Sequence, residues 1–367
     1  MNEPLHFPTD YHSIIERIEQ IDAKQYERTR NFVNGAVTYL SPYISRGVIQ
    51  LPQIKEIVVA KYGHYISQKL IQELAWREFF QRVWQHKQEQ IFTDLKQDQL
   101  KVAHHLMPIS IEEARTGIEA IDHAIQNLYS SGYMHNHARM YTAMLACNIA
   151  QSHWLSPAKW MYYHLLDGDL ASNMLSWQWV AGSFSSKKYY ANQENINKYT
   201  GTNQQKTIVD YSYEELPNVE IPTALKAIKE VNLNTPLPST NTPIIDHRLP
   251  ILVYNSYNLD PNWHNKKTAN RILLLEPAHF SSYPISKKVL DFILALALDN
   301  IEGIQVYTGT FDSLKKLALD TTIIYKEHPL NNHYIGKMEP RAWLFDQVNQ
   351  YHGSFFSYWK KCERYYQ

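Results

Sequence analysis

The sequence has little that could support a disulfide framework or a membrane anchor. Of its 367 residues, only two are cysteines and 12 are glycines. Two cysteines cannot build a disulfide scaffold or a cysteine-ligated zinc or iron–sulfur centre, so we expect a reducing cytoplasm and no metal cluster. The longest apolar run, Val289 to Leu298, is interrupted by Asp291 and is shorter than the roughly 18 residues of a membrane span. The N-terminus lacks the basic and then apolar layout of a secretory signal, and no membrane partner is expected.

Neither sign of charge is in excess, whereas aromatic residues are abundant. The chain has 36 basic and 36 acidic side chains, so no global attraction to nucleic acid exists, and such a role requires a local basic patch. Aromatic residues make up 13% of the sequence and include nine tryptophans and 26 tyrosines. Several of the tryptophans lie beside clusters of polar residues, which core packing alone does not explain.

Periodicity divides the sequence into two kinds of structure. Residues 1–215 carry apolar residues at helical spacing, for example across 65–88 and 118–150. Residues 216–248 are rich in proline, asparagine and threonine, which is typical of a linker. Residues 249–367 contain short β-rich runs that alternate with a helical segment, which indicates a small α/β domain with a parallel sheet. We therefore expect an all-helical domain followed by a small α/β, Rossmann-like domain; the latter contains neither G-x-G-x-x-G nor a P-loop.

One polar cluster is the segment DGDLASN, which is followed by WQW. Asp167 and Asp169 lie two residues apart at a helix end, and Asn173 follows four residues later. These groups can bind a hydrogen-bond-rich heterocycle from one side. Alternatively, the segment is a capped helix with two packing tryptophans, Trp177 and Trp179.

A second cluster lies on one helix face. Glu73, Trp76 and Arg77 share that face, and Phe80 and Trp84 continue it. A face of this composition suits a cleft that stacks a planar ring. The alternative is an ion pair between Glu73 and Arg77, four residues apart, beside a partly covered tryptophan.

Two further segments carry polar groups at defined spacing. In HNHARM, Asn136, Arg139 and Met140 fall on one helix face, whereas the two histidines lie two residues apart and point to different sides. We therefore expect no zinc site there. In TYLSPY, Thr38 and Ser41 precede or begin a helix whose N-terminus suits phosphate, although such a segment is also a common helix start.

Taken together in their order along the chain, these segments resemble the FAD-binding helical domain of the photolyase/cryptochrome family. The matching motifs are TYLSPYISRG, ELAWREFF, HNHARM and DGDLASNMLSWQW, and the resemblance covers about residues 20–200. Members of that family place an α/β antenna domain before the flavin domain, whereas here the α/β segment follows it. Residues 249–367 are therefore either a rearranged antenna-like domain or an unrelated addition.

The resemblance implies a set of FAD-binding residues. Four match positions that contact the phosphates: Tyr26, Thr38, Leu40 and Ser41. Six match positions around the isoalloxazine, ribose and adenine: Arg77, Asn136, Arg139, Asp167, Asp169 and Asn173. The neutral amide of Asn173 matches the position near flavin N5 and suits the reduced anionic form, FADH⁻. Arg139 is expected to balance a buried carboxylate.

The resemblance also implies electron transfer. Trp177 matches the tryptophan beside the flavin, and Trp154 matches the second tryptophan of the relay. No tryptophan lies between Trp84 and Trp154 to serve as a third, so a tyrosine or Trp160 stands as the candidate.

The implied substrate is UV-damaged DNA. Four residues match the wall that receives a flipped cyclobutane pyrimidine dimer: Glu73, Trp76, Met140 and Trp179. The implied activity is that of a deoxyribodipyrimidine photolyase-like lyase, in which excited FADH⁻ donates an electron to the dimer. The alternative is a cryptochrome-like blue-light photoreceptor that signals without repair. Five residues are candidates for DNA phosphate contacts: Arg28, Arg30, Arg46, Lys187 and Lys188. The oligomeric state is not predicted.

Overall fold

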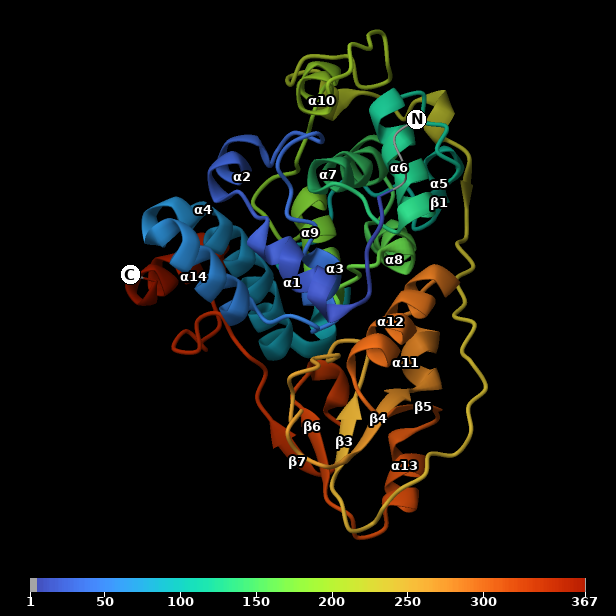
Figure 1. Ribbon diagram of the computed structural model, residues 1–367. Coiled ribbons are helices and arrows are strands. Elements are labelled where there is room, and N and C mark those ends of the chain that lie inside the picture. Colours follow the sequence, from blue (N-terminus) through green and yellow to red (C-terminus); the bar gives the residue numbers. More distant parts are fainter. Residues whose placement is uncertain (1–4, 367) are drawn as a thin grey trace. The chain divides into compact units, whose positions relative to one another are not determined.

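The computed structural model describes residues 5–366, which form two compact units built from discontinuous stretches of chain. Unit 1 is helical. Unit 2 combines N-terminal helices with a parallel sheet and a C-terminal helix (Figure 1). This architecture confirms the expected fold class of helical and α/β parts. Of the described residues, unit 1 contains 5–6, 24–37 and 86–232, and unit 2 contains 7–23, 38–85 and 233–366.

Unit 1 consists mainly of short helices that pack on one another. Its helical elements are α2 (Ala23–Thr29, which begins at the unit boundary), η1 (Gln88–Phe92), α5 (Ile109–Glu112), α6 (Glu119–Ser131), α7 (Asn136–Met144), η2 (Leu145–Ile149), α8 (Leu155–His164), α9 (Leu170–Ala181), α10 (Gln193–Thr200), η3 (Leu216–Asn218) and η4 (Thr223–Leu225). A two-stranded antiparallel ribbon joins β1 (Met107–Pro108) to β2 (Ile228–Lys229). Helices α7 and α9 pack on each other and bring together two of the polar motifs that the sequence singles out, HNHARM and DGDLASN.

The expected helical stretch over 118–150 is divided by a glycine. Gly132 ends α6 in the left-handed region, with φ of 74°, and a side chain there would meet the Cγ atom of Leu166 at 2.6 Å. Glycine is the residue that adopts this conformation without strain. The chain therefore turns after α6, and α7 starts in a new direction with His135 as its N-cap.

The helices of unit 2 come from both ends of the chain. They are α1 (Tyr11–Glu19), α3 (Ser41–Ser45), α4 (Leu51–Lys87, whose last two residues belong to unit 1), α11 (Pro277–Ser282), α12 (Lys287–Asn300), α13 (Phe311–Ala318), η5 (Pro329–Asn331), α14 (Phe355–Cys362) and η6 (Glu363–Tyr365). Within α4, Gly63 has φ of 73° and interrupts the helical backbone. The expected helix over 65–88 is the part of α4 that follows this interruption.

The sheet of unit 2 is entirely parallel, as expected. Its strands lie in the order β5-β4-β3-β6-β7. Their bounds are β3 (Ile251–Tyr254), β4 (Asn270–Leu275), β5 (Ile304–Thr308), β6 (Ile323–Lys326) and β7 (Lys337–Glu339). The central strand β3 pairs Val253 with Ile272 of β4 and with Tyr325 of β6. Four strands match the β-rich runs of the sequence. Strand β7 was not predicted, because its three residues, KME, carry no β pattern and two of them are exposed.

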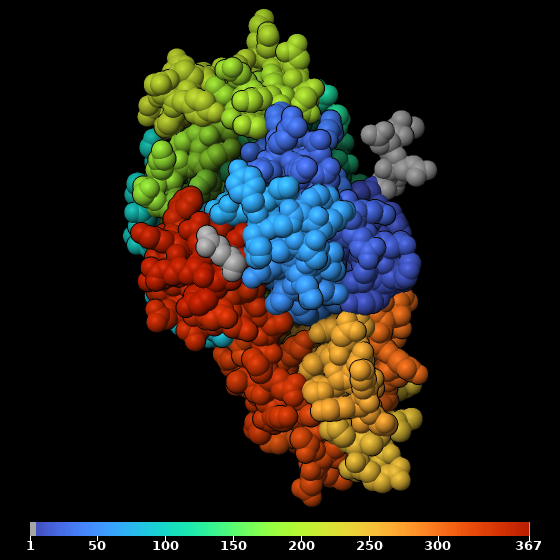
Figure 2. Space-filling model, turned by 60° about the vertical axis from the view of Figure 1, so that its left-hand side comes forward, coloured from blue at the N-terminus to red at the C-terminus, as the bar shows by residue number. Residues whose placement is uncertain are grey.

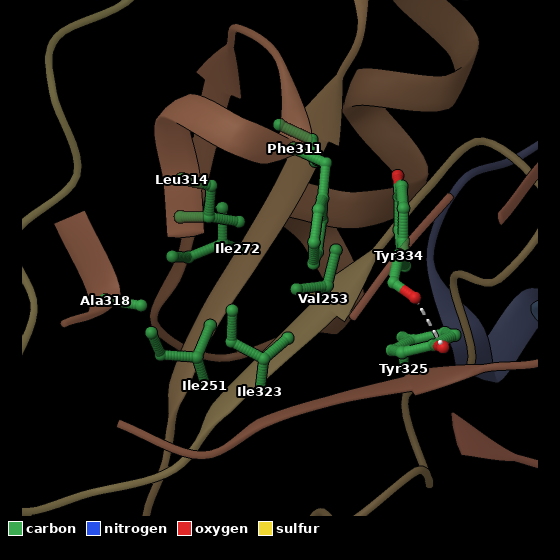
Figure 3. Close-up of a cluster of buried hydrophobic side chains, with 10 residues drawn as sticks. Ile251, Val253, Ile272, Phe311, Leu314, Ala318, Ile323, Tyr325 and Tyr334 are labelled. Atoms are coloured by element: carbon green, nitrogen blue, oxygen red, sulfur yellow. Dashed lines mark hydrogen bonds between the residues drawn. The ribbon is translucent and has the colours of Figure 1, made fainter. Parts of the chain in front are cut away.

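One face of this sheet forms an apolar core with α13. Figure 3 shows Val253, Ile272 and Ile323 from neighbouring strands pointing toward Phe311 and Leu314 of α13. Phe311 stacks on Tyr334 with ring centroids 4.2 Å apart. The hydroxyl of Tyr325 donates to the carbonyl of Tyr334, 3.0 Å away, so the polar groups that enter this core are satisfied.

Packing divides the chain at different points from the expected domain boundaries. The α/β segment shares unit 2 with residues 38–85, and the expected linker over 216–248 contains β2 and crosses from unit 1 to unit 2. That residues 1–215 and 249–367 are two separate domains joined by a linker stays a prediction. No helix within residues 5–366 combines the length and the apolar character needed to cross a bilayer.

Candidate functional site

The DGD motif lies at the N-terminus of α9, as the sequence predicts. Asp169 is the N-cap, and its carboxylate accepts a hydrogen bond from the Ser172 amide at 2.7 Å. The helix thereby gains a partner for one of its free N–H groups. The hydroxyl of Ser172 is buried and has no partner among the described residues. Asn173 donates through Nδ2 to the carbonyl of Ala158 at 2.9 Å, which fixes its amide orientation.

Arg139 and Asp167 form the ion pair expected of a buried carboxylate. One terminal nitrogen of Arg139 lies 2.8 and 3.0 Å from the two oxygens of Asp167, whose side chain is 4% exposed. The Nε atom of Arg139 donates to the carbonyl of Met134 at 2.7 Å. This second contact holds the guanidinium in place, so α7 presents a fixed cation to the start of α9.

His135 is a neutral helix cap. Its Nδ1 atom accepts from the His137 amide at 3.2 Å, and its Nε2 atom lies 3.1 Å from the carbonyl of Arg30. This pattern requires the tautomer that carries the proton on Nε2. Burial, with a smaller contribution from the neighbouring His137, lowers the pKa of His135 to about 4. Across residues 5–366 the structure groups no three histidine, cysteine, aspartate or glutamate side chains that could hold a metal ion.

Asn136 and Met140 lie together on α7. The Nδ2 atom of Asn136 is 3.8 Å from the sulfur of Met140, one helical turn along. The prediction that these two residues share a helix face with Arg139 is therefore confirmed.

The two expected relay tryptophans belong to the neighbouring helices α8 and α9. Trp154 is the N-cap of α8, and Trp177 lies within α9, one turn beyond Asn173. The hydrogen bond from Asn173 to Ala158 joins these two helices. Trp177 and Trp154 are buried, at 2% and 0% exposure.

Asp94 holds the indole of Trp154, and sequence reasoning missed it. The indole Nε1 atom donates to the carboxylate of Asp94 at 2.6 Å. Asp94 also accepts from the Gln99 amide and lies 3.4 Å from His153. No spacing rule joins residues 94 and 154, so this contact could not be predicted from the sequence.

Trp160 and Trp179 have different surroundings. Trp160 is fully buried and donates through its indole nitrogen to the hydroxyl of Tyr129 at 3.1 Å. Trp179 is 37% exposed and lies against Tyr189 with ring centroids 5.7 Å apart. Trp179 is therefore accessible from solvent, whereas Trp160 belongs to the core of unit 1.

The expected phosphate-binding segment belongs to unit 2. Leu40 is buried and Ser41 begins α3, while the Leu40 amide lies 3.5 Å from the hydroxyl of Thr38. Between them Tyr39 has φ of 53°, in the left-handed region that non-glycine residues rarely adopt. Such local strain is found at binding sites more often than elsewhere. Tyr26, the fourth expected phosphate contact, is a half-buried residue of unit 1.

On α4, the structure gives Glu73 and Trp76 partners that the sequence did not suggest. Glu73 forms an ion pair with Lys69 at 2.9 Å, one turn earlier. Trp76 stacks on Phe355 of α14, with ring centroids 3.7 Å apart and planes 11° from parallel. One face of the Trp76 ring is thus covered by the C-terminal helix. Arg77 follows on the same helix within unit 2.

Two residues expected to contact DNA phosphates are wrong for that role. Arg46 is 0% exposed and packs its guanidinium over the ring of Tyr257 at 5.8 Å. The ammonium group of Lys188 is buried without a hydrogen-bond partner among the described residues, and burial lowers its pKa. Both had been placed at the surface because basic side chains are rarely buried.

The residues that α7 and α9 bring together fit FAD. A flavin and its ribose require acceptors for N–H and O–H groups, a donor, and a cation to balance the carboxylates. Asp167, Asp169, Asn173 and Arg139 supply these groups within unit 1. The buried, unpartnered hydroxyl of Ser172 beside them is a polar group that a bound ligand would satisfy.

Comparison with known proteins identifies the part of the chain that carries these motifs. A family described as the FAD binding domain of DNA photolyase matches residues 70–231. The deoxyribodipyrimidine photo-lyase of Escherichia coli (strain K12) is 29% identical over 194 residues, which cover 48% of this chain and 40% of that protein. The photo-lyase of a Synechococcus species is 31% identical over 174 residues, covering 43% of this chain and 35% of its own length. This chain therefore spans about two fifths of the curated relatives that it matches.

Solved structures of the same kind are similar over about half of the chain. A Synechocystis cryptochrome is 23% identical, with a TM-score of 0.46, and the match covers 53% of this chain and 44% of that one. A bacterial class III photolyase from Agrobacterium tumefaciens is 21% identical, with a TM-score of 0.43, covering 57% and 54% of the two chains.

Proposed function

Because residues 70–231 match the FAD binding domain of DNA photolyase, we propose that the chain is a member of the photolyase/cryptochrome family and a light-driven DNA repair enzyme acting on cyclobutane pyrimidine dimers. The observation that carries the proposal is the assembly of Arg139, Asp167, Asp169 and Asn173 at the facing ends of α7 and α9. These are the residues for which the sequence motifs predict contact with FAD, and unit 1 holds them in a hydrogen-bonded arrangement.

Each residue of this arrangement has a defined physical task. Asp167 accepts hydrogen bonds from the cofactor while Arg139 neutralises its charge, so a buried carboxylate is tolerated. Asp169 both caps α9 and presents an acceptor. Asn173 contributes a neutral amide, which neither protonates nor repels an anionic ring.

Reduced FAD, when bound, supplies the electron that splits the dimer. In this chain Trp177 and Trp154 provide a buried path for an electron toward the cofactor, and Asp94 orients the second indole. A carboxylate next to an indole also stabilises positive charge on that ring.

We propose that the four residues of the expected substrate wall, which are Glu73, Trp76, Met140 and Trp179, contact the dimer. A dimer stacks poorly in the duplex, so its extrusion costs less than that of normal bases. The exposed ring of Trp179 stacks the extruded base, and the Glu73 carboxylate accepts from base N–H groups.

The experiment has two steps. The purified protein is expected to be yellow and to release FAD on heating, and a colourless preparation that cannot be reconstituted would contradict the flavin site. The reduced protein is then illuminated with blue light in the presence of an oligonucleotide that carries one dimer. Light-dependent loss of the dimer supports repair. Equal affinity for damaged and undamaged DNA, with no loss of dimers, would exclude it.

A second candidate function is a cryptochrome-like photoreceptor. The neutral charge of the chain and the burial of Arg46 and of the Lys188 ammonium favour it, because two of the five candidate phosphate contacts are thereby lost. A photoreceptor is expected to photoreduce bound FAD, and Trp177→Phe is expected to slow that reaction, while no dimer is lost from irradiated DNA. The two functions therefore separate in the same pair of assays.

A further inference from the structure

The C-terminal helix α14 is firmly anchored on α4 within unit 2. The hydroxyl of Tyr358 donates to the buried carboxylate of Glu78 at 2.6 Å, and the amides of Phe345 and Leu344 donate to the same carboxylate. Phe355 is 2% exposed and stacks on Trp76. Farther along, the hydroxyl of Tyr366 donates to the carbonyl of His64 at 2.7 Å. Figure 2 shows these last residues, in red, on the surface beside the first half of α4, in light blue.

This anchoring turns the opposite side of α14 outward. Phe356 is 73% exposed, although it directly follows the buried Phe355, and its ring meets the edge of Trp76 at 6.3 Å. Lys360 lies one helical turn from Phe356 on the same side, and Lys361 and Arg364 flank it; all three are exposed. Tyr365, 49% exposed, adds a further ring.

The outward side of α14 is basic in a chain that is neutral overall. Residues 353–366 contain three basic side chains and a single acidic one, Glu363. Three cations that lie between two exposed rings match the two requirements of a single nucleic-acid strand, which are neutralisation of the phosphates and stacking of the bases. An uncharged protein partner would need only the rings, and a second copy of this chain would bring like charges together.

We infer that the outward side of α14, made by Phe356, Lys360 and Lys361 and continued by Arg364 and Tyr365 of η6, binds an unpaired DNA strand. Phe356 stacks a base next to the edge of Trp76, and the basic residues hold the phosphates on its C-terminal side. The inference rests on the proposed function, because Trp76 belongs to the proposed substrate wall. It extends the proposed DNA-binding surface of the protein to a segment that lies outside residues 70–231, the part matched to the FAD-binding domain.

The test measures binding of the full chain to a fluorescein-labelled thymidine oligonucleotide by anisotropy. Phe356→Ala is expected to weaken binding about tenfold, as loss of one stacked base does. The pair Lys360→Gln and Lys361→Gln is expected to reduce the slope of log affinity against log salt by about 1.4, or about 0.7 for each lost phosphate contact. The matched control is Lys315→Gln with Lys316→Gln, two adjacent exposed lysines of α13 in the same unit, which is expected to bind like the wild type.

Three outcomes would overturn the inference: no binding of the oligonucleotide by the wild type, wild-type affinity and salt slope in both α14 variants, or an equal loss in the control. If the wild type forms a protein dimer that Phe356→Ala dissociates, while DNA binding is unchanged, this surface belongs to a contact between two copies of the chain instead.

The assay for repair of the pyrimidine dimer, done on the same preparations, distinguishes the inference from the proposed function. Light-dependent repair together with wild-type oligonucleotide binding in the α14 variants overturns only the inference, whereas α14-dependent binding without light-dependent repair overturns only the proposed function.

Discussion

At the scale of single residues, the candidate site depends on pairing a buried charge. Asp167 has almost no contact with solvent, and Arg139 is the cation that balances it. Removing one member of such a pair leaves an uncompensated charge, which costs far more than the pair contributes when it is intact.

Arg139→Met is therefore expected to lower the free energy of unfolding by about 3 kcal/mol and to weaken FAD retention. The double variant Arg139→Met with Asp167→Asn is expected to recover much of the stability but not the FAD, because the stranded charge is gone while the ligand contacts are still missing. Urea unfolding and the ratio of flavin to protein absorbance measure the two effects.

The control is Arg248→Met, which breaks an ion pair of Arg248 with Asp246 whose arginine side chain is 88% exposed. Its unfolding midpoint is expected to match the wild type, because exposed pairs contribute little. A wild-type midpoint in Arg139→Met as well would contradict the importance of the buried pair.

At the scale of elements, α7 begins at a histidine that must remain neutral. The pKa of His135 is lowered from 6.5 to about 4, so the unfolded chain binds a proton more readily than the folded chain between these values. The stability that His135 contributes is thus complete above pH 6.5 and is lost as the pH falls toward 4.

Relative to pH 7.5, this residue is expected to cost about 2 kcal/mol of stability at pH 5. His135→Asn keeps an acceptor for the N-cap but does not titrate, so its stability is expected to vary less over this range. Urea unfolding at the two pH values measures the difference. The exposed His12→Asn is the control, and an identical pH dependence in His135→Asn and the wild type would contradict the assignment.

Helices and strands that depend on a local sequence pattern were predicted, whereas contacts between residues far apart in the sequence were not. The parallel strands β3 to β6 and helix α12 follow from short apolar runs and a serine cap, which are features of neighbouring residues. The helix positions of the expected site residues on α7 and α9 were predicted because each motif is contiguous, and their contacts with FAD stay a prediction. Asp94 beside Trp154 and Phe355 on Trp76 were not found, because residues that far apart in sequence leave no periodic signal when they meet. Burial of Arg46 and of the Lys188 ammonium was missed for the same reason.

At the scale of the whole molecule, a hydrogen bond between distant parts of the chain joins two helices of unit 2, α4 and α14. Tyr358 of α14 and Glu78 of α4 are 280 residues apart in sequence. Burial raises the pKa of Glu78, and the hydrogen bonds that it accepts partly oppose this effect. The hydroxyl of Tyr358 is therefore a partner that the buried carboxylate needs whenever it is ionised.

Tyr358→Phe is expected to lower the free energy of unfolding by about 2 kcal/mol, the usual range for a hydrogen bond to a charged group. Loss of this donor raises the pKa of Glu78 further, so the deficit is expected to decrease from pH 8 toward pH 5 as protonation relieves the unpaired charge. Tyr365→Phe, at a half-exposed ring in the next turn, is the control and is expected to leave the midpoint unchanged. Chemical unfolding at both pH values measures the effect. Equal free energies of unfolding for Tyr358→Phe and Tyr365→Phe would contradict the role of this contact.

The discontinuous composition of unit 2 also has a consequence during synthesis. Residues 38–85 leave the ribosome early, yet their partners in 233–366 follow only after unit 1 has been made. At about 5–20 residues per second, the delay is roughly 15–55 s. During that time Trp84 and Phe79, which the finished protein buries completely, have no C-terminal partner to cover them. The nascent chain is therefore expected to expose this apolar surface of α4 until the C-terminal part is made, and a truncated chain that ends before α14 would leave Phe79 without Phe355 and Tyr358 permanently.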